Sequence, residues 1–263
     1  MISKDKNLFL QQSCNIVAVT SGIGSMGKTW LATTLAHALY QLKKKILLFD
    51  ADNGLANIGF QIGLKPTYYL NDVANDTICF NQAIFPIYKK KFDVLSGITG
   101  SELLENMPLG RLQLINDDLT IISKNYDMVI MDLSASEKII NNLIPLQSDV
   151  ILVCTNEPSN LVSTYKFLQD MSQNRKYKSM RIVINYANSY EEGRQTYNML
   201  KLACEQFLKE TPEFLGIVRR DTRVRDAIRN QTLLLNRYPD SEAVYDVLSI
   251  ARKILEKEAK NDE

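Results

Sequence analysis

The feature that most constrains this chain is a glycine-containing loop between an apolar run and a segment with helical periodicity. Residues 16–19 (Ile-Val-Ala-Val) are apolar and mostly β-branched, which predicts a buried strand. Residues 22–29 read Gly-Ile-Gly-Ser-Met-Gly-Lys-Thr and fit the pattern G-x-x-x-x-G-K-[ST]. Such a loop turns backbone N–H groups toward a polyphosphate, and the following helix adds the positive end of its dipole. We call residues 22–29 the phosphate loop.

The loop and the residue after it predict a site for the polyphosphate of a nucleotide with Mg²⁺, and the family resemblance given below implies that the nucleotide is ATP or ADP. The Lys28 ammonium can reach the β- and γ-phosphates, and the Thr29 hydroxyl can ligate Mg²⁺. An ordinary strand-to-helix turn could match the pattern by accident, but the strand before it and the helix after it make that alternative the minor one. The residues predicted here to bind the nucleotide are Gly22, Gly24, Ser25, Met26, Gly27, Lys28, Thr29 and Trp30.

Acidic residues follow two further strand-like runs. Asp50 and Asp52 come after residues 46–49, and Asp132 ends a second apolar run. Ligands of open α/β sheets bind at the carboxyl ends of the strands. Carboxylates at that edge can hold Mg²⁺ through water and orient an attacking water molecule. The predicted metal ligands are Thr29, Asp50 and Asp132, and the predicted catalytic residues are Lys28 and Asp52.

Strand-like and helix-like segments alternate along the rest of the chain, which predicts an α/β fold. We expect three layers: a mostly parallel, twisted sheet with helices on both of its faces. Residues 1–13 are expected to form a tail, and residues 14–263 a single domain, because no linker or repeat interrupts them. Further strands are predicted at 92–95, 149–154, 180–185 and 215–218, short helices at 67–74 and 80–87, and longer helices at 111–125, 192–209 and about 241–259.

Composition excludes several classes of protein. The formal net charge of +1 gives no global field that would recruit nucleic acid or membrane. The four cysteines are widely separated, so we expect buried free thiols in a reducing compartment. No signal peptide or membrane-spanning run is found, and a cytoplasmic location is expected. His37, the one histidine, lies off the apolar stripe of its helix and is expected at the surface.

Taken together, these motifs resemble those of the MinD/ParA superfamily of P-loop ATPases, and more narrowly its flagellar FlhG/FleN/YlxH branch. The resemblance covers nearly the whole chain after about residue 14. Besides the phosphate loop, it rests on residues 50–57 (Asp-Ala-Asp-Asn-Gly-Leu-Ala-Asn), Ser96-Gly97, residues 155–159 (Thr-Asn-Glu-Pro-Ser), residues 181–188, and residues 221–239 with their Val-x-x-Ala-Ile-x-x-Gln core.

The resemblance implies an ATPase that forms a nucleotide-sandwich homodimer and controls the number or placement of flagella through an ATP-dependent switch from monomer to dimer. It implies partners such as an FlhF-like GTPase, a transcription regulator or basal-body components, and a place in the cytoplasm with peripheral contact at the inner membrane face or cell pole. For individual residues, it implies Asp50 as a switch I partner, Asp52 as the group that orients water, Asp132 as the Walker B carboxylate and Asn185 as an adenine contact.

Several positions depart from the family pattern. Ile23 stands where relatives carry a signature lysine that crosses the dimer to the partner's phosphate. Loss of one such electrostatic contact commonly costs about 2.7–4 kcal/mol, or about 100- to 1,000-fold in rate. Ser25 replaces a glycine, Trp30 a small polar residue and Arg219 a proline, and residues 133–137 lack the usual glycine. Nucleotide binding is therefore better supported than hydrolysis, which we expect to be slow.

Two other functions remain open. The first is a protein-binding scaffold of the same fold that does not hydrolyse nucleotide, which Ile23 motivates. The second is a ParA-like DNA-associated partition ATPase, which a run of arginines motivates. DNA binding is disfavoured because no groove-reading motif accompanies the arginines. The arginines are Arg219, Arg220, Arg223, Arg225, Arg229 and Arg237.

The C-terminal helix at about 241–259 has an apolar stripe that could dock on a membrane or pack on the domain. Residues 241–263 hold six acidic and four basic side chains and no Trp or Phe. Membrane-surface helices favour a basic polar face with aromatic anchors. Packing is therefore favoured over membrane docking.

Overall fold

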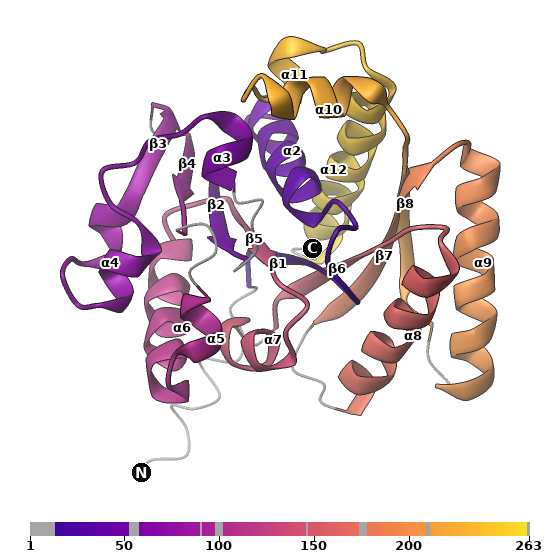
Figure 1. Ribbon diagram of the computed structural model, residues 1–263, viewed down its shortest axis with the longest axis horizontal. Coiled ribbons are helices and arrows are strands. Elements are labelled where there is room, and N and C mark those ends of the chain that lie inside the picture. Colours follow the sequence, from indigo (N-terminus) through magenta and orange to yellow (C-terminus); the bar gives the residue numbers. More distant parts are fainter. Residues whose placement is uncertain are drawn as a thin grey trace.

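A sheet of mostly parallel strands lies at the centre of the computed structural model, with helices on both faces (Figure 1). The structure describes residues 14–52, 58–89, 91–97, 102–145, 147–173, 178–208 and 211–261. Within these residues the sheet has eight strands in the order β3-β4-β2-β5-β1-β6-β7-β8. All neighbours are parallel except the β3–β4 pair at one edge. The predicted fold class is confirmed, while the predicted tail at 1–13 lies outside the described residues.

The elements have the following bounds. The strands are β1 (Ile16–Ser21), β2 (Ile46–Ala51), β3 (Ile84–Tyr88), β4 (Phe92–Leu95), β5 (Met128–Leu133), β6 (Asp149–Cys154), β7 (Ser179–Ala187) and β8 (Glu213–Arg219). The helices are α2 (Lys28–Gln41), α3 (Ile58–Ile62), α4 (Leu70–Ala74), the 3-10 helix η2 (Phe80–Ala83), α5 (Leu103–Asn106), α6 (Leu109–Ser123), α7 (Glu137–Leu143), α8 (Pro158–Gln173), α9 (Tyr190–Phe207), α10 (Thr222–Arg229), α11 (Leu234–Arg237) and α12 (Glu242–Asn261).

The inner strands are buried on both faces, which is why they read as continuous apolar runs. Every residue of β1, β2, β5 and β6 is buried. One apolar cluster joins the sheet to α4 and to α6, α7, α8 and α9. The other joins the opposite face to α2 and to α10, α11 and α12. The two clusters are the two interfaces between the sheet and its helix layers, so the three predicted layers are present.

The register of the central strands brings the predicted acidic residues together. Asp50 of β2 lies directly beside Asp132 of β5, and Asp132 lies beside Val19 of β1, two residues before the end of that strand at Ser21. Since parallel strands share one carboxyl edge, the two carboxylates lie at the base of the phosphate loop, which leaves the same edge.

Helix α12 packs on its own domain. Its apolar residues Val244, Val247, Ile250 and Ile254 are buried against α2 and β8. Gly216 of β8 permits this approach, since a Cβ there would lie 2.6 Å from Cγ1 of Ile250. The apolar stripe is thus used inside the fold, in agreement with the favoured alternative. None of the described helices is long and apolar enough to cross a bilayer.

Three local expectations were wrong or incomplete. Residues 80–87 were predicted as a helix, but η2 ends at Ala83 and β3 follows, because Ile84 to Tyr88 pair antiparallel with β4. Pro86 is tolerated there because β3 is an edge strand. Helix α7 was not predicted, although its Ser136 cap accepts the N–H of Ile139. All four cysteines are free thiols, but only Cys154 and Cys204 are buried.

His37 is not at the surface, contrary to expectation. Its side chain is 1% exposed and its ring lies 5.7 to 6.1 Å from the rings of Tyr40, Tyr88 and Phe92, measured between centroids. Helix α2 is buried nearly all round, by the sheet on one side and by α11 and α12 on the other, so a stripe of aliphatic residues does not mark all of its covered face. Burial lowers the pKa of His37 to about 4.

Acid should therefore destabilise the fold through His37. The His37 side chain binds a proton near pH 6.5 in the unfolded chain but only near pH 4 in the folded chain. The free energy of unfolding therefore falls as the pH drops between these values, by about 3 kcal/mol from this group. His37→Phe keeps a ring in the stack and removes the titration. Urea unfolding of both proteins from pH 4 to 7 should show the variant gaining stability relative to wild type as the pH falls.

Tyr40→Phe is the matched control, since it alters the same stack without a group that titrates in this range. An equal pH slope in wild type and His37→Phe would contradict the assignment.

Candidate nucleotide site

The phosphate loop connects the end of β1 to the start of α2 through left-handed backbone. Gly27 caps α2 with a φ of 82°, and a Cβ there would lie 2.5 Å from Nδ2 of Asn185. Only glycine fits both restraints. Ser25 has a φ of 64°, a left-handed conformation that costs a non-glycine residue about 1–3 kcal/mol.

Gly22 is fixed by a neighbouring helix. A Cβ at this position would lie 2.5 Å from the backbone oxygen of Ser163 in α8. The loop therefore starts directly against α8. Gly24, by contrast, has open space around it and lies at the exposed part of the loop with Ile23 and Ser25.

Lys28 and Asp52, the two residues predicted to be catalytic, form an ion pair. Nζ of Lys28 lies 3.5 Å from Oδ2 of Asp52, and the two side chains are 7% and 15% exposed. The ammonium is thereby held at the carboxyl edge of the sheet, next to the first turn of α2. A phosphate in the loop would offer it a second anionic partner.

Asp50 and Asp132 are buried carboxylates with unsatisfied oxygens. They are 1% and 0% exposed. Oδ2 of Asp50 accepts the N–H of Ile58 at 3.1 Å and the hydroxyl of Ser96 at 3.5 Å. Among the described residues, no hydrogen bond of ordinary geometry reaches Oδ1 of Asp50 or either oxygen of Asp132. Buried polar atoms without partners are rare and costly, which points to a ligand that these oxygens are arranged to meet.

The charges of this cluster show what kind of ligand fits. Burial, and then the charge of Asp52, raise the pKa of Asp132 to about 7, although Thr29 and Lys28 oppose the shift. Burial, and then the charge of Asp132, raise the pKa of Asp50 well above its usual range. A divalent cation would remove this penalty, since it favours the ionised carboxylates.

The residues present fit Mg²⁺ only together with phosphate. In the described part of the chain, no group of three or more His, Cys, Asp and Glu side chains is placed to hold a metal by itself. Mg²⁺ usually takes one or two protein ligands and completes its shell with water and substrate phosphates. Thr29 and Asp132 can supply the protein ligands, and Asp50 lies beside them.

Asn185 is attached to the loop. Its side chain is 1% exposed, and its Nδ2 donates to the backbone oxygen of Met26 at 2.8 Å. Met26 is itself fully buried, so this bond braces the loop from β7. The predicted contact between Asn185 and adenine stays a prediction. Sequence reasoning missed the next residue, Tyr186, whose hydroxyl also lies against Gly27.

The residues that depart from the family pattern have distinct environments. The Ile23 side chain is 38% exposed at the open part of the loop. Trp30 is 5% exposed and packs in the apolar cluster around α2, so its indole faces the core. Arg219 forms ion pairs with Asp246 and Glu242 and lies over the ring of Tyr190. Its guanidinium is thus engaged within the domain.

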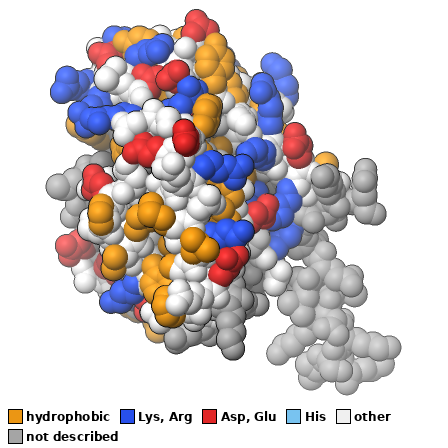
Figure 2. All heavy atoms as spheres, turned by 90° about the vertical axis from the view of Figure 1, so that its right-hand side faces the viewer, with side chains coloured by type: hydrophobic (Ala, Val, Ile, Leu, Met, Phe, Trp, Pro, Cys, Tyr) orange, Lys and Arg blue, Asp and Glu red, His pale blue; other side chains and the backbone are white. Residues whose placement is uncertain are grey.

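The arginine run is interleaved with acidic side chains. Basic and acidic groups alternate across the upper part of the face shown in Figure 2. Carboxylates reach Arg219, Arg223 and Arg237, three of the six arginines. The described part of the chain thus offers fragments of a basic surface rather than the continuous stripe that favours DNA.

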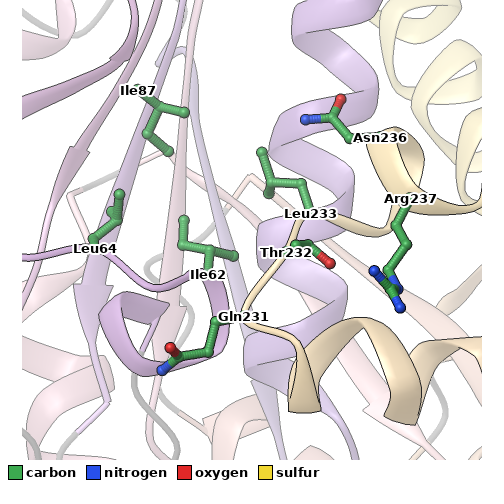
Figure 3. Close-up of a pocket in the computed structure, with 8 residues that line it drawn as sticks. All are labelled: Ile62, Leu64, Ile87, Gln231, Thr232, Leu233, Asn236 and Arg237. Carbon is green, nitrogen blue, oxygen red and sulfur yellow. The ribbon is translucent and has the colours of Figure 1, made fainter.

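A separate hollow of about 400 Å³ lies between α3, β3 and the segment that joins α10 to α11. Ile62, Leu64 and Ile87 line it on the side of α3 and β3, and Leu233 lies across from them together with the polar side chains of Thr232, Asn236 and Arg237 (Figure 3). No predicted site residue lines it. The candidate nucleotide site is the edge of the sheet around the phosphate loop, apart from this hollow.

Replacing Asp132 with Asn should stabilise the nucleotide-free protein above neutral pH. The folded pKa of about 7 exceeds the ordinary value of 3.8, so the stability this group contributes at low pH is lost as the pH rises between them, by at most about 4 kcal/mol. Urea unfolding without nucleotide should show Asp132→Asn gaining on wild type from pH 4 to 8. A stability difference that does not change with pH would contradict this account.

The chain is similar to known proteins over most of its length. Residues 17–234 match the family model described as the CobQ/CobB/MinD/ParA nucleotide binding domain. The chain is 27% identical over 245 residues to the antiactivator FleN of Pseudomonas aeruginosa, which covers 91% of this chain and 85% of the relative. It is 24% identical over 245 residues to the flagellum site-determining protein YlxH of Helicobacter pylori, covering 92% and 82%.

Solved structures share the fold. The septum site-determining protein MinD of Pyrococcus horikoshii, complexed with Mg-ADP, superposes with a TM-score of 0.74 at 18% identity, covering 91% of this chain and 95% of that one. A putative plasmid partition protein of Borrelia burgdorferi, bound to AMPPNP, gives a TM-score of 0.72 at 18% identity, covering 92% and 99%. The match of the family model over most of the chain shows that this protein belongs to the CobQ/CobB/MinD/ParA family of nucleotide-binding domains.

Proposed function

We propose that this protein binds Mg·ATP and Mg·ADP at the phosphate loop and regulates the number or placement of flagella. The relatives that support the flagellar part are YlxH, which is named a flagellum site-determining protein, and FleN, which is named an antiactivator. One observation carries the nucleotide part of the proposal. The unsatisfied carboxylates of Asp50 and Asp132 lie at the carboxyl edge from which the phosphate loop leaves, beside the Lys28–Asp52 ion pair.

The proposed reaction is slow hydrolysis of ATP to ADP and phosphate, and each of these residues would have a task in it. Lys28 would turn from Asp52 toward the β- and γ-phosphates, and Asp52 would then orient the attacking water. Thr29 and Asp132 would hold Mg²⁺, with Asp50 beside them. When bound, the metal neutralises charge on the phosphates. The loop backbone would donate its N–H groups to the phosphate oxygens.

The same carboxylates would couple the site to the chain around it. Asp50 accepts the N–H of Ile58, the first residue of α3. Residues 50–57, which resemble the family's switch I, end just before Ile58, and residues 53–57 of this segment lie outside the described residues. A nucleotide whose Mg²⁺ interacts with Asp50 would alter the hydrogen bond between Asp50 and Ile58. We infer an ATP-dependent change from monomer to homodimer, read by a partner such as an FlhF-like GTPase, with peripheral contact at the membrane or cell pole.

Ile23 favours slow hydrolysis and supports a second candidate function. An aliphatic side chain, 38% exposed at the loop, supplies no charge to the phosphates of a partner subunit. The fold could then serve as a non-hydrolysing scaffold that works through protein contacts. The two candidates differ in whether nucleotide binds and whether it turns over.

Binding is tested by titrating the protein with Mg·ATP in a calorimeter, with Trp30 fluorescence as a second readout. We expect saturable binding that Lys28→Ala abolishes, because the variant loses the charge that meets the phosphates. Lys201→Ala, on the exposed face of α9, is the matched control. In cells, Lys28→Ala should fail to restore the normal flagellar count in a deletion strain. If the wild-type protein does not bind Mg·ATP at millimolar concentration, the first candidate is contradicted and only the scaffold function remains.

Turnover is tested with Ile23→Lys. A lysine at this position restores a cation where charge develops in the transition state, so the rate should rise on the order of 100-fold or more if the dimer forms. Phosphate release and sedimentation velocity measure the two properties. A dimeric variant that hydrolyses ATP no faster than wild type would show that the missing lysine does not limit the reaction.

A further inference from the structure

Tyr186 has a backbone conformation that a bulky side chain seldom adopts. Its φ is 59°, in the left-handed region, although it follows Asn185 directly at the end of β7. For an aromatic residue this conformation is an outlier that persists only where the surroundings fix it. An outlier of this kind invites the question of what its side chain does.

The side chain of Tyr186 lies against the phosphate loop. A Cβ built on Gly27 would lie 3.1 Å from the Tyr186 hydroxyl and 3.4 Å from its Cε2. The residue is nevertheless 39% exposed, whereas its neighbour Asn185 is 1% exposed. One edge of the ring therefore touches the loop at the start of α2, and much of the rest is open to solvent.

The charges around the loop divide the site into two sides. In the sheet, β5 and β2 lie on one side of β1, and β6 and β7 lie on the other (Figure 1). The first side carries Asp50 and Asp132, which suit Mg²⁺ and phosphate. The second carries the amide of Asn185 and the ring of Tyr186, on whose hydroxyl the charge of Arg225 acts. An uncharged base that emerges from the loop would meet the carboxylates on one side and an aromatic ring on the other.

We propose that the Tyr186 ring is the platform on which the purine base of the bound nucleotide stacks. The proposal rests on nucleotide binding at the phosphate loop, and it adds a side chain that recognises the base rather than the phosphates. Stacking needs only a flat aromatic face beside the base, which a side chain clamped at one edge and open elsewhere provides. The left-handed backbone is what turns the ring from β7 toward the loop.

The experiment compares a ligand that has a base with one that has none. Binding of Mg·ADP and of Mg·tripolyphosphate is measured by calorimetry for wild type, Tyr186→Leu and Tyr186→Phe. Leucine keeps apolar bulk at this position but has no ring on which a base could stack. It should weaken Mg·ADP roughly 5- to 150-fold, the range found when aromatic platforms for bases are removed. It should change Mg·tripolyphosphate by no more than about twofold.

Tyr186→Phe keeps the ring and should bind both ligands about as wild type does. Tyr245→Ala removes a comparably exposed tyrosine on α12, which is 54% exposed, and serves as the control. Far-UV circular dichroism checks that each variant is folded. If Tyr186→Leu does not fold, the comparison of Mg·ADP with Mg·tripolyphosphate is made on Tyr186→Gly, which removes the ring and relieves the backbone.

The outcomes separate the two proposals. Equal weakening of both ligands would make Tyr186 a brace for the loop and overturn the stacking proposal, as would unchanged Mg·ADP binding in a folded Leu or Gly variant. If wild type binds neither ligand, nucleotide binding itself fails and the stacking proposal falls with it. Selective loss of Mg·ADP, restored in Tyr186→Phe, is the result we expect.

Discussion

The site depends on one juxtaposition, the side-by-side placement of Asp50 and Asp132 in the register of β2 and β5. Two buried carboxylates in adjacent strands repel one another in a medium that already disfavours charge, so the pKa values of both groups are raised. The remaining parts answer this constraint. Lys28 and Thr29 approach Asp132 from the first turn of α2. Both carboxylates also have oxygens without hydrogen-bond partners, and a metal ion bound with phosphate would reduce the repulsion between their charges.

The phosphate loop and the acidic strand ends could be predicted because their signals are local. The sequence pattern shows that the glycines lie between a strand and a helix and that each aspartate follows an apolar strand. In a parallel α/β sheet both positions are at the carboxyl edge. His37, β3, the Asn185–Met26 bond and Tyr186 could not, because their environments are set by distant partners. Two of the rings around His37 are Tyr88 and Phe92 of the edge pair β3–β4, and β3 is hard to distinguish from a helix in the sequence. Asn185 is separated from Met26 by 159 residues.

Ambiguity of another kind affected α12 and the arginines. The sequence of an apolar stripe is the same whether the helix docks on a membrane or packs on its own domain. In α12 the packing depends on Gly216, because the absence of a side chain there makes room for Ile250. The arginines read as a basic surface until their partners were placed. Asp246, nearly fully buried, accepts bonds from Tyr190 and from the backbone and guanidinium of Arg219, so this charge ties β8 to α9 and α12.

The contact between Gly22 and α8 bears on how such motifs should be interpreted. The space that a side chain at position 22 would need is filled by the backbone of Ser163, not by phosphate. Selection on folding alone would therefore retain this glycine in a descendant that had ceased to bind nucleotide. A glycine of a nucleotide-binding motif can in this way be kept for packing alone after the binding activity has been lost. The carboxylate pair is stronger evidence for a functional site, because three of its four buried oxygens have no hydrogen-bond partner among the described residues.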